Sequence, residues 1–141
     1  MNTIYVDIVS AEGEIYTGDA TMVFAPAQMG EIGIAPNHAP LLTGLRPGGV
    51  RVKTPDGQEL FFYVSGGIIE IQPKHVTILA DTALRARDLD EAAAEQARRR
   101  AEDLLVNRES AVDVARAQAE LAQAAAQLAL LEKIKKAAGH G

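Results

Sequence analysis

The character of the sequence changes sharply near residue 83. All six aromatic residues and all six prolines lie before this point. Residues 84–141 are instead rich in alanine, leucine, glutamine, glutamate and arginine, which have the highest helix propensities. A chain of 141 residues is long enough for one ordinary domain or two small ones. The break therefore predicts two parts, a β domain over residues 1–84 and a helical domain over residues 85–141.

The first part carries the alternating pattern of half-buried β-strands. Ile4, Val6 and Ile8 recur at every second position of residues 3–10 and share one face of the predicted strand. Similar short runs occur at 13–17, 20–25, 49–54, 58–64, 67–72 and 75–80. Turn signals separate the runs, most clearly Thr54-Pro55-Asp56-Gly57-Gln58. Closely spaced strands with no helical pattern between them favour a sandwich or a flattened barrel.

Residues 30–43 are rich in turn formers and carry apolar residues without a clear period. Two interpretations are open for this segment. It is a long buried loop, or it is a rigid contact surface that exposes Glu31 and His38 between constrained turns.

The second part predicts two helices. Asp88 followed by Glu91 forms a capping-box pattern, which predicts a helix from about residue 89 to 106. Its expected apolar face comprises Leu89, Ala93, Ala97, Ala101 and Leu104 or Leu105. Asn107-Arg108-Glu109 breaks the pattern, and Ser110 gives a second capping-like signal for a helix that runs to about 137. Gly139 is the expected stop.

The second helix has an apolar seam close to heptad spacing, at Val114, Ala117, Leu121, Ala124, Leu128 and Leu131. Much of the seam on both helices is alanine. Because each buried CH₂ contributes only about 0.8 kcal/mol, an alanine seam holds two helices together more weakly than a leucine seam. Two alternatives follow: stable helices whose pairing opens, or a static antiparallel hairpin packed on the β domain.

Charge and composition exclude several classes of function. Residues 1–83 hold four basic groups against nine acidic ones, so a nucleic acid is not an expected partner. The chain lacks cysteine, and His38, His75 and His140 have no second histidine at metal-ligand spacing, so no metal site is expected. No window approaches the ~20 apolar residues of a membrane span, and no signal peptide or catalytic constellation is recognisable.

Arg98, Arg99 and Arg100 are three successive cations on the first predicted helix. The simpler interpretation is a solvated face that pairs with Glu95, Glu102 and Asp103 at helical spacing. The functional interpretation is docking onto an acidic partner or a nucleotide.

Several stretches together resemble the epsilon subunit of bacterial F-type ATP synthase. They are Gly30-Glu-Ile-Gly-Ile-Ala-Pro-Asn-His-Ala-Pro-Leu-Leu-Thr43, Ser65-Gly-Gly-Ile-Ile-Glu70, Ala80-Asp-Thr-Ala83 and Asp88-Leu-Asp-Glu-Ala92. Val9–Gly13 and Ala119–Ala122 fit as well, so the similarity covers the whole chain in order.

The resemblance implies an α+β fold in two segregated parts, an N-terminal β-sandwich of about ten strands and a C-terminal antiparallel two-helix hairpin. It implies a non-catalytic rotor subunit without a cofactor, at the cytoplasmic face of the bacterial inner membrane. The implied partners are the gamma subunit, the c-ring and the alpha/beta catalytic ring, and membrane contact runs only through them. The subunit couples rotation to proton transport, and its mobile helices inhibit ATP hydrolysis.

The resemblance also implies roles for particular residues. Glu31 and His38 match the family's c-ring contact. Docking onto gamma or the catalytic ring is expected of the basic groups of the helices, which are Arg98, Arg99, Arg100, Lys133, Lys135 and Lys136.

One departure concerns nucleotide binding. Family members that bind ATP between the helices carry Ile/Leu-Asp-x-x-Arg-Ala, whereas Leu89-Asp90-Glu91-Ala92-Ala93-Ala94 has alanine in the arginine slot. Gln123 and Gln127 stand where such members carry further arginines. The missing guanidinium groups remove charge-assisted hydrogen bonds to phosphate. The alternative function is a nucleotide-sensing module that closes on ATP, with Asp90 and Arg99 as candidate contacts.

Overall fold

The computed structural model describes residues 2–107 and 111–139. The chain forms two compact units, Met1–Ala86 and Arg87–Gly141. Arg108 and Glu109 of the predicted break, the predicted capping residue Ser110 and the tail residue His140 lie outside the described residues.

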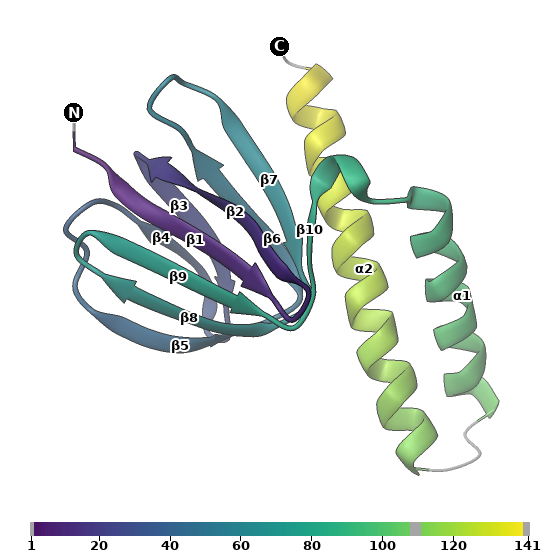
Figure 1. Cartoon of the computed structure of the whole chain (residues 1–141). Coiled ribbons are helices and arrows are strands. Elements are labelled where there is room, and N and C mark those ends of the chain that lie inside the picture. Colours follow the sequence, from purple (N-terminus) through teal and green to yellow (C-terminus); the bar gives the residue numbers. More distant parts are fainter. Residues whose placement is uncertain (1, 108–110, 140–141) are drawn as a thin grey trace. The chain divides into compact units, whose positions relative to one another are not determined.

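The first unit is a ten-stranded sheet that folds over on itself into two layers (Figure 1). Its strands are β1 (Ile4–Ser10), β2 (Gly13–Ala20), β3 (Met22–Ala27), β4 (Gly30–Ile34), β5 (Leu41–Leu45), β6 (Gly48–Lys53), β7 (Glu59–Val64), β8 (Gly67–Gln72), β9 (His75–Ala80) and β10 (Ala83–Arg85). The strand order is β10-β7-β6-β3-β5-β8-β9-β1-β2, with β4 paired to β3 alone. Every pairing is antiparallel except that of β1 with β9. The expected sandwich of about ten strands is thus confirmed.

The core lies between the layers and follows the period-2 pattern of the sequence. Ile4, Val6 and Ile8 are fully buried, as the alternation in residues 3–10 predicts. They pack with apolar residues of the other strands, chiefly Ile34, Val50, Val52, Phe62, Ile69, Ile71 and Ile78. Each fully buried side chain of this size contributes about 1.5–3 kcal/mol, so the core stabilises the β unit without help from the helices.

The predicted hairpin turn at Thr54–Gln58 is confirmed. It joins β6 to β7, Gly57 has a φ of 89°, and the backbone N–H of Thr54 donates to the carbonyl of Gln58 at 2.9 Å. The Thr54 hydroxyl donates to the Asp56 carboxylate, and this hydrogen bond holds the pKa of Asp56 below its ordinary value. The turn therefore has a local polar network in addition to its backbone geometry.

The structure corrects the interpretation of residues 30–43 as one long loop. β4 and β5 occupy both ends of the segment, and only Ala35–Pro40 lies outside strands. The chain reverses at Gly30, whose φ of 129° suits glycine, and β4 then pairs with β3 along its whole length. Ile32 and Ile34 do alternate with Glu31 and Gly33, but a run of five residues is too short to show a clear period.

β10 was not predicted, because it contains only three residues and follows the point where the composition changes. It pairs with β7, and the Arg85 guanidinium donates to the carbonyl of Ile15 at 3.1 Å. These contacts attach residues 83–85 to the β unit.

The second unit contains α1 (Glu91–Asn107) and α2 (Ala111–Gly139), which run antiparallel as a hairpin (Figure 1). α2 ends at Gly139 as expected. The predicted cap at Asp88 is wrong, because Asp88 belongs to a short 3₁₀ turn, Ala86–Asp88. Asp90 caps α1 instead: its Oδ1 accepts hydrogen bonds from the backbone N–H groups of Ala92 at 3.0 Å and Ala93 at 3.2 Å.

The buried face of α1 also differs in part from the predicted one. Ala94 and Ala101 are buried, Ala97 and Leu105 are half-buried, and the predicted Ala93 and Leu104 are exposed. On α2 the predicted seam is confirmed: Ala117 and Ala124 are buried, and the four larger seam residues are half-buried. Leu130 is also buried, although it lies off that seam. The hairpin thus has alanine at the centre of both buried faces.

Candidate interaction surfaces

The β unit has a group of exposed apolar side chains on the outside of one layer. Ile68 of β8 pairs with Leu79 of β9, which also pairs with Val9 of β1, so the three side chains form a row across three strands. Leu42 of β5 lies on the same face, opposite Glu70, and Tyr5 lies further along β1. Leu42, Ile68 and Leu79 are 67%, 49% and 52% exposed. We call Leu42, Ile68, Leu79, Val9 and Tyr5 the outer apolar face.

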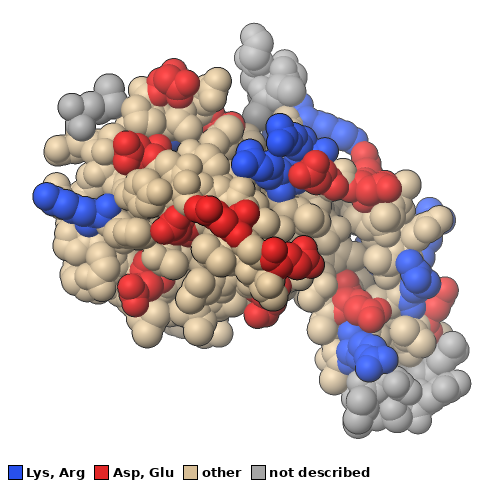
Figure 2. All heavy atoms as spheres, viewed as in Figure 1, with Lys and Arg blue, Asp and Glu red and all other residues tan. Residues whose placement is uncertain are grey.

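Carboxylates accompany this face. Glu70 lies opposite Leu42, Asp7 lies between Tyr5 and Val9, and Asp19 lies opposite Tyr5. Figure 2 shows acidic side chains spread over the visible side of the β unit, with few basic ones among them. The surface therefore suits a partner that is apolar at its centre and basic at its rim.

His75 adds a polar contact at the end of the outer apolar face. Its Nε2 lies 3.1 Å from Oδ2 of Asp7, and its ring meets the Tyr5 ring edge-on at a centroid distance of 5.2 Å. This contact could not be predicted, since a histidine and an aspartate 68 residues apart show no local pattern in the sequence. The contact fixes the orientation of the Tyr5 ring.

Glu31 and His38 lie on different kinds of structure. Glu31 is exposed on β4, opposite Pro26, next to a turn in which Met29 is 98% exposed. His38 is half-buried in the loop before β5, with Nδ1 2.7 Å from the carbonyl oxygen of Ala39. Within the described part of the chain no hydrogen bond or ion pair joins the two. Both side chains reach solvent, so neither is needed for the core.

The basic groups of the hairpin differ in their partners. Arg98 pairs with Glu95, and Arg99 lies 4.0 Å from the same carboxylate, which agrees with a solvated helical face. Lys136 lies 3.9 Å from Glu132 within α2, whereas Lys135 lies 2.8 Å from Glu91 of α1. Arg100 and Lys133 have no ion pair among the residues described, and neither have the expected partners Glu102 and Asp103.

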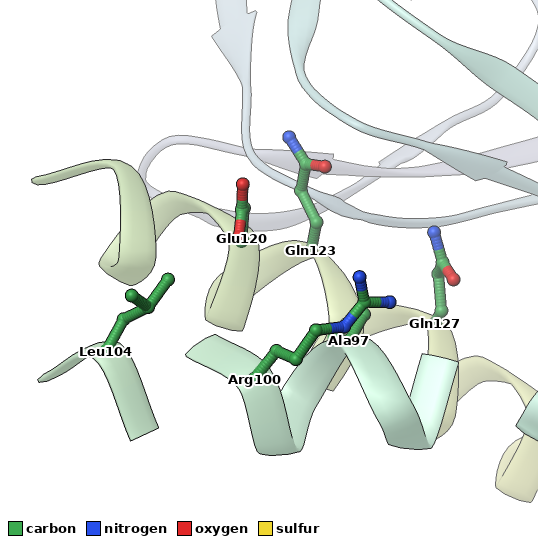
Figure 3. Close-up of a pocket in the computed structure, with 7 residues that line it drawn as sticks. Ala97, Arg100, Leu104, Glu120, Gln123 and Gln127 are labelled. Atoms are coloured by element: carbon green, nitrogen blue, oxygen red, sulfur yellow. The ribbon is translucent and has the colours of Figure 1, made fainter. Parts of the chain in front are cut away.

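A pocket of about 400 Å³ opens between the two helices. Ala97 and Ala124 lie in its wall, and their small side chains leave space that larger residues would fill. Its polar lining is Arg100 from α1 with Glu120, Gln123 and Gln127 from α2, and Leu104 completes it (Figure 3). The volume falls in the range of small-molecule sites. The proposed nucleotide contacts Asp90 and Arg99 are not in this lining, and Asp90 is engaged as the cap of α1.

The pocket brings Arg100 together with Gln123 and Gln127, which the sequence pattern alone did not connect with it. Gln123 and Gln127 stand one turn apart on α2, and both line it with Arg100. The donor set contains one guanidinium and two neutral amides, and the Glu120 carboxylate opposes an anion. Such a lining binds phosphate weakly compared with one built from several arginines.

Among the residues that the structure describes, no group of three or more histidine, aspartate or glutamate side chains is placed to hold a metal ion. No helix in the part of the chain that is described is both long and apolar enough to cross a bilayer.

Comparison with known proteins gives the family. The β-sandwich domain of the ATP synthase delta/epsilon chain matches residues 3–86, and the long α-helix domain of the same chain matches residues 87–132. The ATP synthase epsilon chain of Alkalilimnicola ehrlichii is 62% identical over 138 residues, covering 98% of this chain and 99% of the relative. That of Nitrosococcus oceani is 61% identical over 137 residues, covering 97% and 98%.

A solved structure shows the same fold. A chain of the mitochondrial ATP synthase of Euglena gracilis, in a structure of OSCP, F1 and the c-ring in rotational state 1, aligns with a TM-score of 0.75 at 19% identity. The alignment covers 97% of this chain and 82% of that one. With both units matched in order and relatives above 60% identity, this chain belongs to the ATP synthase epsilon chain family.

Proposed function

We propose that this chain is a non-catalytic rotor subunit of a proton-translocating ATP synthase, and that its helical hairpin restrains ATP hydrolysis. The observation that carries the proposal is the match of both units to the epsilon chain, at up to 62% identity over almost the whole length. The assigned place is peripheral, at the cytoplasmic face of a bacterial inner membrane. Contact with the membrane runs through partner subunits.

The outer apolar face is the proposed docking surface for the gamma subunit. Exposed leucine and isoleucine side chains that gather on one face of a sheet are typical of a protein contact. Their burial against gamma would supply the apolar centre of the interface, and Glu70, Asp7 and Asp19 would receive basic groups at the rim. A well-packed β unit provides the rigid support that transmission of torque requires.

The proposed c-ring contact is the region of Glu31 and His38. Glu31 is exposed on β4 and His38 lies in the loop before β5, and polar side chains that reach solvent suit contact with a polar loop better than with lipid. Met29 lies two residues from Glu31 and is almost fully exposed, so it extends the same surface with an apolar tip.

The proposed inhibitory element is the hairpin. Alanine keeps each helix stable, while the contact between the helices buries little apolar area and leaves a pocket. The helices can therefore separate without melting and offer their basic groups, Arg98, Arg99, Arg100, Lys133, Lys135 and Lys136, to gamma or the catalytic ring. Arg100 and Lys133 are the readiest of these, because neither breaks an ion pair among the described residues in order to dock.

A second candidate function is nucleotide sensing, which the pocket between the helices favours. Arg100 would supply the only guanidinium of that lining, with Gln123 and Gln127 as neutral donors. The rotor function remains the leading proposal, since Glu120 faces the same space and the donor set is poor in positive charge.

The outer apolar face can be tested at Ile68 and Leu79, a cross-strand pair of β8 and β9. Changing Ile68 and Leu79 to serine should weaken binding to purified gamma about tenfold, because two half-exposed apolar contacts are lost. The free energy of unfolding should change by no more than about 0.5 kcal/mol per substitution. The matched control is Ile69→Ala, which removes a buried side chain and should cost about 2–5 kcal/mol of stability. Unchanged affinity of the double serine variant for gamma would exclude this face.

The c-ring contact can be tested by changing Glu31 and His38 together to alanine. The reassembled enzyme should show weaker coupling of ATP hydrolysis to proton pumping, measured by acidification of vesicles. The melting temperature of the chain should stay the same, because both side chains are outside the core. Glu12→Ala, which removes an exposed carboxylate elsewhere, is the control. A large fall in the melting temperature would assign the pair to folding instead.

The inhibitory role can be tested by removing residues 87–141. The cut leaves β10 in place, so the β unit should fold and the complex should assemble. We expect several-fold higher ATP hydrolysis by the reconstituted enzyme, with the subunit content checked on a denaturing gel. Equal hydrolysis with and without the hairpin would contradict the inhibitory role.

Nucleotide sensing can be tested by calorimetric titration of the full chain with magnesium ATP. We expect no heat of binding at micromolar ATP. Heat that disappears in Arg100→Gln but persists in Arg99→Gln would instead establish the pocket as a nucleotide site, because Arg99 points to solvent outside its lining.

A further inference from the structure

The two helices of the hairpin differ in length, so the C-terminal end of α2 extends past the beginning of α1. α1 has 17 residues and α2 has 29. The buried alanines among the described hairpin residues are Ala94 and Ala101 on α1 and Ala117 and Ala124 on α2. At a rise of about 1.5 Å per residue, α2 continues well beyond the first residue of α1. Ala124, the last buried alanine among the described side chains of α2, therefore lies well before the C-terminal part of that helix.

One ion pair connects this C-terminal part to α1. Nζ of Lys135 lies 2.8 Å from Oε2 of Glu91, the first residue of α1. The other ion pairs of the described hairpin residues, those of Glu95 and Glu132, stay within one helix. The Glu91–Lys135 pair is therefore the one ion pair that crosses between α1 and α2 among the side chains described.

Both members of the pair are placed favourably in their own helices. Glu91 lies at the positive end of α1, and Lys135 lies near the negative end of α2. Each residue therefore helps its own helix whether the hairpin is open or closed. Only the attraction between the two side chains depends on closure.

We infer that the Glu91–Lys135 ion pair is an electrostatic latch, which holds the C-terminal end of α2 on α1 and sets how often the hairpin opens. The alanine contact beside it is weak and partly hollow, so a single crossing pair makes up a substantial share of the closing interaction. Only the physiological role of the latch rests on the proposed function. Its existence is a property of the isolated full-length chain.

The latch should be sensitive to salt. The two side chains are 58% and 65% exposed, so mobile ions screen their attraction. Rising ionic strength should increase the open fraction of the native hairpin. Apolar contacts do not weaken in this way with salt, so the dependence distinguishes the ion pair from the alanine seam.

The test measures the distance between the helices by double electron–electron resonance. The chain has no cysteine, so Ala93→Cys on α1 and Ala129→Cys on α2, both at exposed positions, give two unique spin-label sites. We expect Glu91→Gln and Lys135→Gln each to increase the ratio of open to closed hairpin roughly two- to five-fold, as for an exposed ion pair. The double variant should open no further than the single variants, because the coupling is lost once.

Two controls separate the latch from other effects. Glu132→Gln removes a carboxylate that pairs within α2, and it should leave the open fraction unchanged. Circular dichroism of every variant should show the same helix content. Added salt should open the native hairpin and have little effect on Glu91→Gln.

The latch is overturned if Glu91→Gln opens the hairpin no more than Glu132→Gln does. It is also overturned if the effects of the two single changes simply add, or if native and variant hairpins all stay closed at every salt concentration. These outcomes concern distances in the isolated chain. A failure of the proposed function would appear separately, as unchanged ATP hydrolysis by a complex that lacks residues 87–141.

Discussion

Alanine at the centre of the contact between α1 and α2 is the constraint on which the behaviour of the second unit depends. A methyl group fills little space, so Ala97 and Ala124 border a pocket where leucines would have met. The same residue type has the highest helix propensity, so weak pairing does not imply weak helices. The stability of each helix therefore depends on helix propensity, whereas the cohesion between the helices depends on their apolar contact. In the β unit, by contrast, the interleaved isoleucine and valine side chains make the strands interdependent.

Under the proposed function, separate control of helix stability and helix pairing lets one short chain meet two mechanical requirements. A part that transmits rotation has to be stiff, and the fully buried core around Ile8, Ile69 and Ile78 supplies stiffness. A part that changes position has to rearrange at a small cost in free energy. The weak contact between the helices, which is built on Ala94, Ala101, Ala117 and Ala124, allows this. Exposed polar contacts between α1 and α2 then contribute a larger share of the pairing free energy than they would beside a leucine-rich interface.

Much of the fold could be predicted from the sequence, because its patterns are local. The alternation at Ile4, Val6 and Ile8, the turn at Asp56-Gly57 and the seam on α2 each depend on neighbouring residues, and all three are confirmed. Elements of five residues or fewer could not be seen. β4, β5 and β10 hold too few residues to establish a period, and pairing with distant strands fixes them. The capping residue of α1 was misplaced by two positions, because Asp88 and Asp90 offer the same chemistry and only the preceding 3₁₀ turn distinguishes them.

The candidate surfaces were harder to predict from the sequence than the fold. The outer apolar face combines residues of β1, β5, β8 and β9, which only the register brings together. Arg100 differs from Arg98 and Arg99 by its position around α1, and only the packing of α1 against α2 shows that it lines the pocket. Family resemblance supplied Glu31 and His38, yet the structure shows that they occupy different elements, and no hydrogen bond or ion pair joins them among the described residues.

The parallel pairing of β1 with β9 has a consequence for how the chain is made. β1 is synthesised first, but one of its two neighbours consists of residues 75–80. Until those residues leave the ribosome, the β1–β2 hairpin has an unpaired edge and cannot complete its sheet. The β unit therefore closes only after nearly all of its own residues have been synthesised. During this interval, the unpaired strand edge is the surface that chaperones would have to cover.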